Sequence, residues 1–127
     1  MSRPLSDKSW QYRALNAQTP SLSALSDALI ALVQAGEPVV ALTADLQYSN
    51  GLVKFAQACP DRFIQCGISE QNMVSAAAGM AAVGLKPYVA TFASFLALLC
   101  CEQIRTDLPY CGLPVRLIGH HAGIPLG

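Results

Sequence analysis

The chain has 127 residues and no net formal charge, since eight Lys and Arg residues balance eight Asp and Glu residues, and neither sign gathers into a run. This balance argues against a nucleic-acid backbone or an anionic membrane surface as partner. Charged residues make up only 13% of the chain, against a usual share of about 25%, so we expect part of the surface to face another chain.

The start of the chain and its longest apolar run argue against a secreted or membrane protein. MSRPLSDKSW lacks an apolar signal core. PYVATFASFLALLCC, residues 87–101, is shorter than the roughly 20 residues that a spanning helix needs. We therefore expect a cytoplasmic protein.

The cysteines form no C-x-x-C pair, and their odd number argues against a disulfide framework. We predict buried, reduced thiols. The alternative is a catalytic cysteine paired with His120 or His121, for which the sequence has no local signature. The cysteines are Cys59, Cys66, Cys100, Cys101 and Cys111.

The first 20 residues contain two prolines and scattered polar groups, which predicts an N-terminal arm or linker at residues 1–20. Residues 21–127 then form the folded domain. Ser21 can cap a helix whose apolar residues recur at three- and four-residue steps and which ends at Gly36.

Further along the chain, short apolar segments alternate with helical segments. The predicted strands are residues 38–43, 62–66, 86–92 and 115–119, and the helices between them are residues 53–58, about 70–82 and 95–108. Uniformly apolar strands that alternate with helices are typical of a parallel sheet covered on both faces, so the predicted fold class is α/β.

Polar residues follow each predicted strand, in the segments ADLQYSN, GISE, TFASF and GHHAGIPLG. In a parallel sheet the ligand crevice lies outside these strand ends.

Ser69 is the expected cap of the helix that begins at Glu70, the only charged residue between Phe63 and Leu85. A glutamate there can stabilise the helix dipole by about 0.3 to 1 kcal/mol. In a dry cleft it can instead share a proton with a ligand nitrogen.

DRFIQCGISEQNMVSAAAGMAAVGLKPYVATFASF, preceded by TADLQYSN and followed by EQIRTD and GHHAGI, resembles the pyrimidine-binding domain of transketolases. The resemblance covers about residues 39–127 and has the character of the split transketolases, in which this domain begins a separate C-terminal subunit. It implies a thiamine diphosphate-binding fold that is truncated here, because the family continues with a Gly-rich turn, the rest of the domain and a C-terminal domain.

The resemblance also implies roles for single residues. Glu70 matches the glutamate that hydrogen-bonds the aminopyrimidine of thiamine diphosphate and favours its imino tautomer, whose nitrogen removes the thiazolium C2 proton. Phe92 and Phe95 match aromatic positions that pack against the pyrimidine, although alone they would be read as core residues. A third aromatic residue of that pocket is replaced at about Leu98.

Asp45 matches an acidic residue near the cofactor and the subunit interface, and His121 matches a histidine near the reacting carbons. Each is by itself an ordinary turn or loop residue. The implied catalytic residues are Glu70 and His121, and the implied cofactor-binding residues are Glu70, Phe92, Phe95 and Asp45. No residue is assigned to a metal, since Mg²⁺ is expected on a diphosphate-binding domain outside this chain.

The implied function is transfer of a two-carbon ketol unit between sugar phosphates, within carbohydrate metabolism. The expected partner is the diphosphate-binding subunit of a split transketolase, in a dimer or larger homo-oligomer, and the chain alone is expected to be inactive. Three alternatives stay open: the β subunit of a 2-oxo acid dehydrogenase, a deoxyxylulose phosphate synthase, against which His121 counts, and a non-catalytic interaction remnant.

Overall fold

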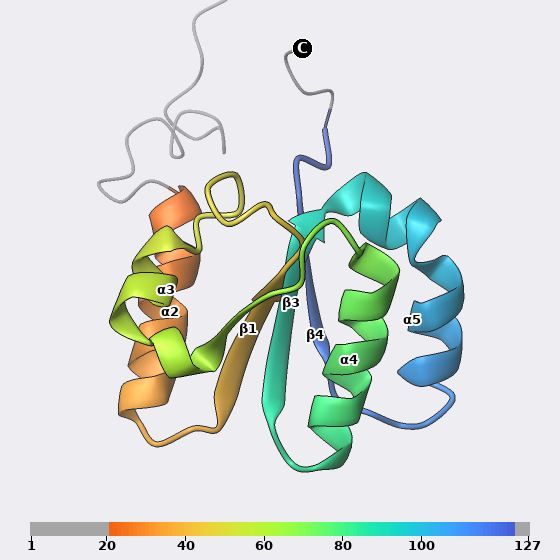
Figure 1. Ribbon diagram of the computed structural model, residues 1–127, viewed down its shortest axis with the longest axis horizontal. Coiled ribbons are helices and arrows are strands. Elements are labelled where there is room, and N and C mark those ends of the chain that lie inside the picture. The colour runs from red at the N-terminus through yellow and green to blue at the C-terminus, as the bar shows by residue number, and fades with distance from the viewer. Residues whose placement is uncertain (1–20, 124–127) are drawn as a thin grey trace, which may run out of the picture.

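The computed structural model describes residues 21–123, so the predicted arm at residues 1–20 and residues 124–127 lie outside the described residues. Within this range strands and helices alternate along the chain (Figure 1). The elements are α2 (Ser21–Gln34), β1 (Val39–Thr43), α3 (Val53–Ala58), a 3-10 turn η1 (Pro60–Arg62), β2 (Phe63–Gln65), α4 (Glu70–Ala82), β3 (Lys86–Phe92), a π-helical turn η2 (Phe95–Leu99), α5 (Cys101–Asp107) and β4 (Arg116–His120).

The strands form one sheet in the order β2-β1-β3-β4, and every neighbouring pair is parallel. Helices α2 and α3 cover one face, and α4 and α5 cover the other (Figure 1). This arrangement confirms the predicted α/β fold with a parallel sheet and helices on both faces.

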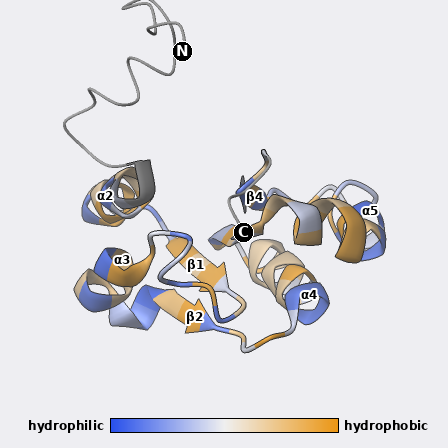
Figure 2. Cartoon of the chain, turned by 90° about the horizontal axis from the view of Figure 1, so that it is seen from above, coloured by the Kyte–Doolittle hydropathy of each residue, from blue (hydrophilic) through white to orange (hydrophobic). Residues whose placement is uncertain are grey.

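β1 lies inside the sheet, and all of its residues are buried. Val39 and Ala41 pack with residues of α2 and α3, whereas Val40 and Leu42 pack with residues of α4. Because both faces of the strand are covered, its sequence is uniformly apolar instead of alternating. Figure 2 shows this hydrophobic strand between the two helix layers.

The single helix predicted over residues 95–108 is divided in the structure. The Cys100 N–H closes the π-helical turn by donating to the Phe95 carbonyl at 2.9 Å. The first bond of α5 then runs from the Ile104 N–H to the Cys100 carbonyl. A π-helical turn inserts a residue and shifts the helical register, which apolar spacing alone did not indicate.

Ser69 precedes α4 as predicted, but it does not cap the helix through its side chain. Its hydroxyl instead donates to the Cys66 carbonyl at 2.8 Å. The hydroxyl therefore closes the turn between β2 and α4, and the backbone of that turn fixes where the helix begins.

The prediction of buried cysteines holds for Cys100 and is wrong for Cys101 and Cys111, which are exposed. Cys101 begins α5 on its solvent side, and Cys111 lies in the turn that follows this helix. Burial raises the pKa of the Cys66 and Cys100 thiols. Both thiols therefore stay protonated at neutral pH, which does not favour either as a nucleophile.

Candidate functional site at the carboxyl edge of the sheet

The segments that follow the strands meet at one edge of the sheet, because parallel strands end on the same side. The chain passes from β1 outward to β2 and then crosses back to β3, so the connections change direction between β1 and β3. Ligand crevices of doubly wound sheets form at such a switch point. Asp45, Glu70, Phe92 and His121, all predicted as site residues, lie at the strand ends on this edge or in the segments that follow them.

Glu70 is the first residue of α4 and is only 6% exposed. It is the one charged side chain among the buried residues of the described chain. The helix start favours a carboxylate there, because the first N–H groups of a helix carry partial positive charge. Glu70 lines a pocket of about 440 Å³ together with Gln71 and Leu99. Among residues 21–123 its carboxylate has no hydrogen-bond or ion-pair partner, so it is free to bind a ligand in this pocket.

Cys100 is a buried neighbour of Glu70. Burial raises the pKa of the Cys100 thiol, and the negative charge of Glu70 raises it further. The thiol is therefore neutral at pH 7.

Three predicted site residues form one cluster. The ring centroids of Phe92 and Phe95 lie 5.5 Å apart at an interplanar angle of 42°. The rings of Phe92 and His121 lie 4.7 Å apart, edge to face at 61°. Both separations are typical of stabilising aromatic pairs. Phe95 remains 36% exposed as a residue, but neither it nor Phe92 is among the residues that line the Glu70 pocket.

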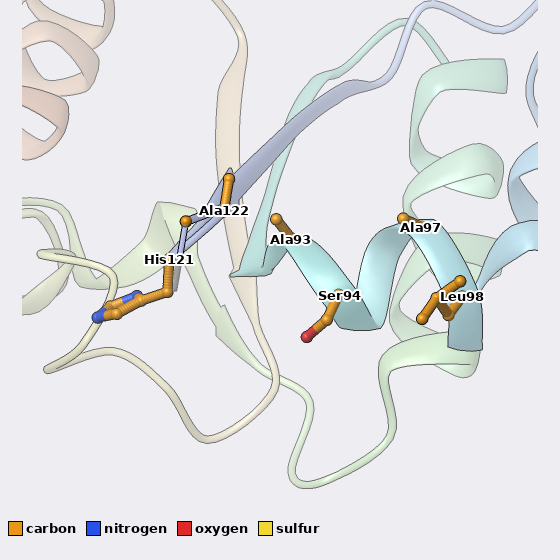
Figure 3. Close-up of a pocket in the computed structure, with 7 residues that line it drawn as sticks. Ala93, Ser94, Ala97, Leu98, His121 and Ala122 are labelled. Atoms are coloured by element: carbon orange, nitrogen blue, oxygen red, sulfur yellow. The ribbon is translucent and has the colours of Figure 1, made fainter. Parts of the chain in front are cut away.

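A second pocket, of about 570 Å³, lies between the turn that leads into η2 and the segment after β4 (Figure 3). Ser94 and Leu98 line it from one side and His121 from the other. Leu98 is 81% exposed and holds the position where the family resemblance implies an aromatic ring. Glu70 does not line this pocket. The structure therefore places Glu70 and His121 in two different pockets. A leucine of η2 also lines each of them, Leu99 beside Glu70 and Leu98 beside His121.

Asp45 lies outside the linings of both pockets. It is exposed, and its backbone N–H donates to the Gln65 Oε1 at 2.6 Å. Asp45 and His121 both have positive φ angles, of 57° and 55°. Such angles are uncommon outside glycine and cost energy, so the surrounding structure must hold both turns in place.

Asn50 is a residue that sequence reasoning did not single out. It is fully buried, and its Nδ2 donates to the Ala90 carbonyl at 2.8 Å and to the Thr43 Oγ1 at 3.3 Å. These two hydrogen bonds hold the segment after β1 against β1 and β3, the two strands of the switch point. Asn50 belongs to the polar segment ADLQYSN, but a partner 40 residues further along the chain could not be read from that segment.

The described residues contain no cluster of three or more His, Cys, Asp or Glu side chains that could hold a metal ion. They also contain no helix long and apolar enough to cross a membrane.

Fold and site define a doubly wound α/β domain whose ligand edge carries a buried carboxylate at a helix start and an aromatic cluster at neighbouring strand ends. Residues 19–127 match the family model described as "Transketolase, pyrimidine binding domain". The chain belongs to this family. The resemblance found in the sequence motifs is thereby confirmed.

Transketolases and deoxyxylulose phosphate synthases are both among the relatives. The 6-deoxy-6-sulfo-D-fructose transketolase subunit SqwH of Clostridium sp. (strain MSTE9) is 37% identical over 98 residues, which cover 77% of this chain and 30% of that protein. The 1-deoxy-D-xylulose-5-phosphate synthase of Mycobacteroides abscessus is 40% identical over 113 residues, which cover 88% of this chain and 18% of the synthase.

A solved structure described as "Split gene transketolase, inactive beta4 tetramer" matches with a TM-score of 0.69 and 41% identity, covering 76% of this chain and 32% of that one. This chain therefore spans at most about a third of the length of these relatives.

Proposed function

We propose that the chain is the pyrimidine-binding part of a thiamine diphosphate-dependent transketolase, which transfers a two-carbon ketol unit between sugar phosphates. The observation that carries this proposal is Glu70, a buried carboxylate beside a pocket and without a partner among the described residues. Similarity to a transketolase subunit and to a split-gene transketolase structure supports the same class.

The residues present fit the pyrimidine end of the cofactor. A buried carboxylate is suited to a ring nitrogen that shares a proton with it, and burial strengthens such a hydrogen bond relative to one in water. Phe95 is a partly exposed residue whose ring packs against Phe92, and this aromatic pair would offer a pyrimidine an apolar surface to pack on.

When bound, the cofactor would supply the nucleophilic carbon that takes up the ketol unit. In this proposal Glu70 holds a proton at the pyrimidine ring nitrogen, while Phe92 and Phe95 orient the ring and exclude water. His121, which lies edge to face with Phe92 and lines the second pocket, donates a hydrogen bond to the transferred unit or to its sugar phosphate.

We assign the diphosphate and Mg²⁺ to the diphosphate-binding subunit of a split transketolase, in a cytoplasmic assembly with more than one copy of this chain. We place Asp45 at the subunit interface, next to the cofactor. Its exposure suits an interface, and because it lines neither pocket, its approach to the cofactor would be from the partner side. Residues 21–127 form the pyrimidine-binding domain in this account.

A second candidate is the synthesis of a 1-deoxy sugar phosphate. It is favoured by the synthases, which are 38% to 41% identical to this chain. A 1-deoxy sugar lacks the hydroxyl on C1, so the unit transferred would be an acetyl group instead of a ketol group.

An assay of the transferred unit tests the proposal and separates the two candidates. The chain would be combined with a purified diphosphate-binding subunit, thiamine diphosphate and Mg²⁺, and offered either a ketose phosphate or a 2-oxo acid as donor, with an aldose phosphate as acceptor. Mass spectrometry should detect a product extended by a hydroxyl-bearing two-carbon unit from the ketose phosphate. Exclusive formation of a 1-deoxy product would favour the second candidate, and no transfer in any mixture would contradict both.

A further inference from the structure

Gln71 connects the start of α4 to the π-helical turn η2. Its Nε2 donates a hydrogen bond to the carbonyl of Leu99 at 3.0 Å. Gln71 follows Glu70 directly in the chain, and all three residues line the same pocket. Leu99 ends the turn that Phe95 begins. One hydrogen bond therefore joins the segments that carry Glu70 and Phe95.

The Leu99 carbonyl is available to Gln71 because the helix is broken after η2. The Cys100 N–H donates back to Phe95, whereas α5 makes its first bond to the Cys100 carbonyl. Leu99 thus lies at a helix end, where carbonyl groups need a partner from outside the helix. The side-chain amide of Gln71 is such a partner.

We propose that Gln71 is a positioning residue, whose amide fixes Glu70 and Phe95 at the separation that a bound pyrimidine requires. The proposal rests on the proposed function, because it assigns Glu70 and Phe95 to the pyrimidine site. Gln71 itself is exposed and its hydrogen bond is solvent-accessible, so the bond contributes more to local order than to the stability of the whole domain.

Hydrogen exchange of the chain by itself tests the bridge directly. Gln71→Ala removes the side chain, and Gln71→Glu keeps its size but lacks a donor at neutral pH. The Cys100 amide, which closes the π-helical turn, should exchange roughly two- to tenfold faster in both variants, as expected for the loss of one hydrogen bond. Gln57→Ala is the matched control, an exposed helical glutamine without a hydrogen-bond partner among the described residues.

The positioning role is tested by the affinity for thiamine diphosphate with Mg²⁺ and a diphosphate-binding subunit. Both Gln71 variants should raise the cofactor Kd by roughly two- to tenfold, while the unfolding midpoint of the chain shifts by no more than about 2 °C. A residue with only a structural role would lower the midpoint and leave the Kd of the folded protein unchanged.

Unchanged Cys100 exchange and an unchanged Kd in the Gln71 variants, or equal changes in the Gln57 variant, would overturn the inference. If the wild-type chain binds no cofactor with the partner present, the proposed function fails, and Gln71 is then rejected as a positioning residue even if exchange responds. Faster exchange with an unchanged Kd would show that Gln71 orders η2 without positioning the site.

Discussion

At the residue scale, the position of Glu70 needs a physical reason. Glu70 is a buried residue, 6% exposed as a whole, and its carboxylate has no hydrogen-bond or ion-pair partner among residues 21–123. Burying a carboxylate costs free energy unless a partner replaces the lost water. The partial positive charge at the start of α4 offsets only about 0.3 to 1 kcal/mol at an exposed site and up to about 2 kcal/mol at a partly buried one. A ligand that shares a proton with Glu70 would supply the missing interaction.

Replacing Glu70 with alanine should therefore affect chemistry more than folding. We expect the turnover of the chain combined with a diphosphate-binding subunit to fall by about 10² to 10⁴, the usual range for a lost proton-transfer group. The unfolding midpoint should stay the same or rise, because a buried polar group without a partner among the described residues is removed. Steady-state kinetics and thermal unfolding measure the two effects.

Glu102→Ala is the matched control for Glu70→Ala, since Glu102 also lies in the first turn of a helix but is exposed. It should leave turnover unchanged. A loss of turnover below tenfold in Glu70→Ala would contradict the assigned role of Glu70.

Asn50 is predicted to stabilise the switch point of the sheet. Asn50→Ala removes the bonds to the Ala90 carbonyl and the Thr43 hydroxyl, and leaves that carbonyl buried without this donor. The free energy of unfolding should fall by about 1 to 3 kcal/mol. Asn72→Ala is the control, because Asn72 is exposed. Urea denaturation should show that this substitution changes the free energy of unfolding by no more than about 0.5 kcal/mol. Equal losses in both variants would contradict the role of Asn50.

At the element scale, two glycines should respond to alanine with opposite signs. A Cβ on Gly119 in β4 would lie 3.0 Å from both the Cα and the Cβ of Ala93, in the turn that connects Phe92 to η2. Gly119→Ala should cost about 1 to 3 kcal/mol by overpacking. Gly79 lies in α4 with no atom within 4 Å of an added Cβ, so Gly79→Ala should stabilise the chain by about 0.5 to 1 kcal/mol.

Thermal unfolding of the two glycine variants measures these shifts, and chemical shifts of the Phe92 and His121 rings report the local effect. Only Gly119→Ala should move the ring resonances, because the added Cβ would displace Ala93, which directly follows Phe92 in the chain. A stable Gly119→Ala variant with unchanged rings would contradict the close packing of this turn.

The bounds of α4 and β3 could be predicted from the sequence because local signals mark both ends of each. Ser69 precedes α4, Glu70 begins it and Gly84 follows it, and the apolar run KPYVATF, between Gly84 and the polar segment around Ser94, forms β3. The division of the segment 95–108 could not be predicted, because a π-helical turn keeps the segment helical and apolar.

At the scale of the whole molecule, the sequence could place the predicted site residues at one sheet edge but could not say which of them touch. Phe92, Phe95 and His121 meet in one cluster, whereas Glu70 lies in a neighbouring pocket. These contacts depend on loop conformations, including the positive φ angle of His121, that periodicity does not encode. Asn50 and Gln71 were missed for the same reason, since their partners are distant in the chain.

Exposed apolar side chains help to line the two pockets. Ile68, Leu98 and Leu99 are 84%, 81% and 46% exposed, and they lie in or next to the linings of the two pockets. Exposed apolar residues that gather at a site are typical of a surface that a partner covers. This agrees with the proposal that a diphosphate-binding subunit completes the site.

Calorimetric titration with thiamine diphosphate and Mg²⁺, with and without a diphosphate-binding subunit, tests the central claim most directly. Ring packing and one hydrogen bond supply only a few kcal/mol, against an association cost of about 4 kcal/mol or more. The chain alone should therefore bind the cofactor no more tightly than about millimolar. With the partner, binding should be about micromolar or tighter, and Glu70→Gln should weaken it. Micromolar binding by the chain alone, or no binding with the partner present, would contradict the account.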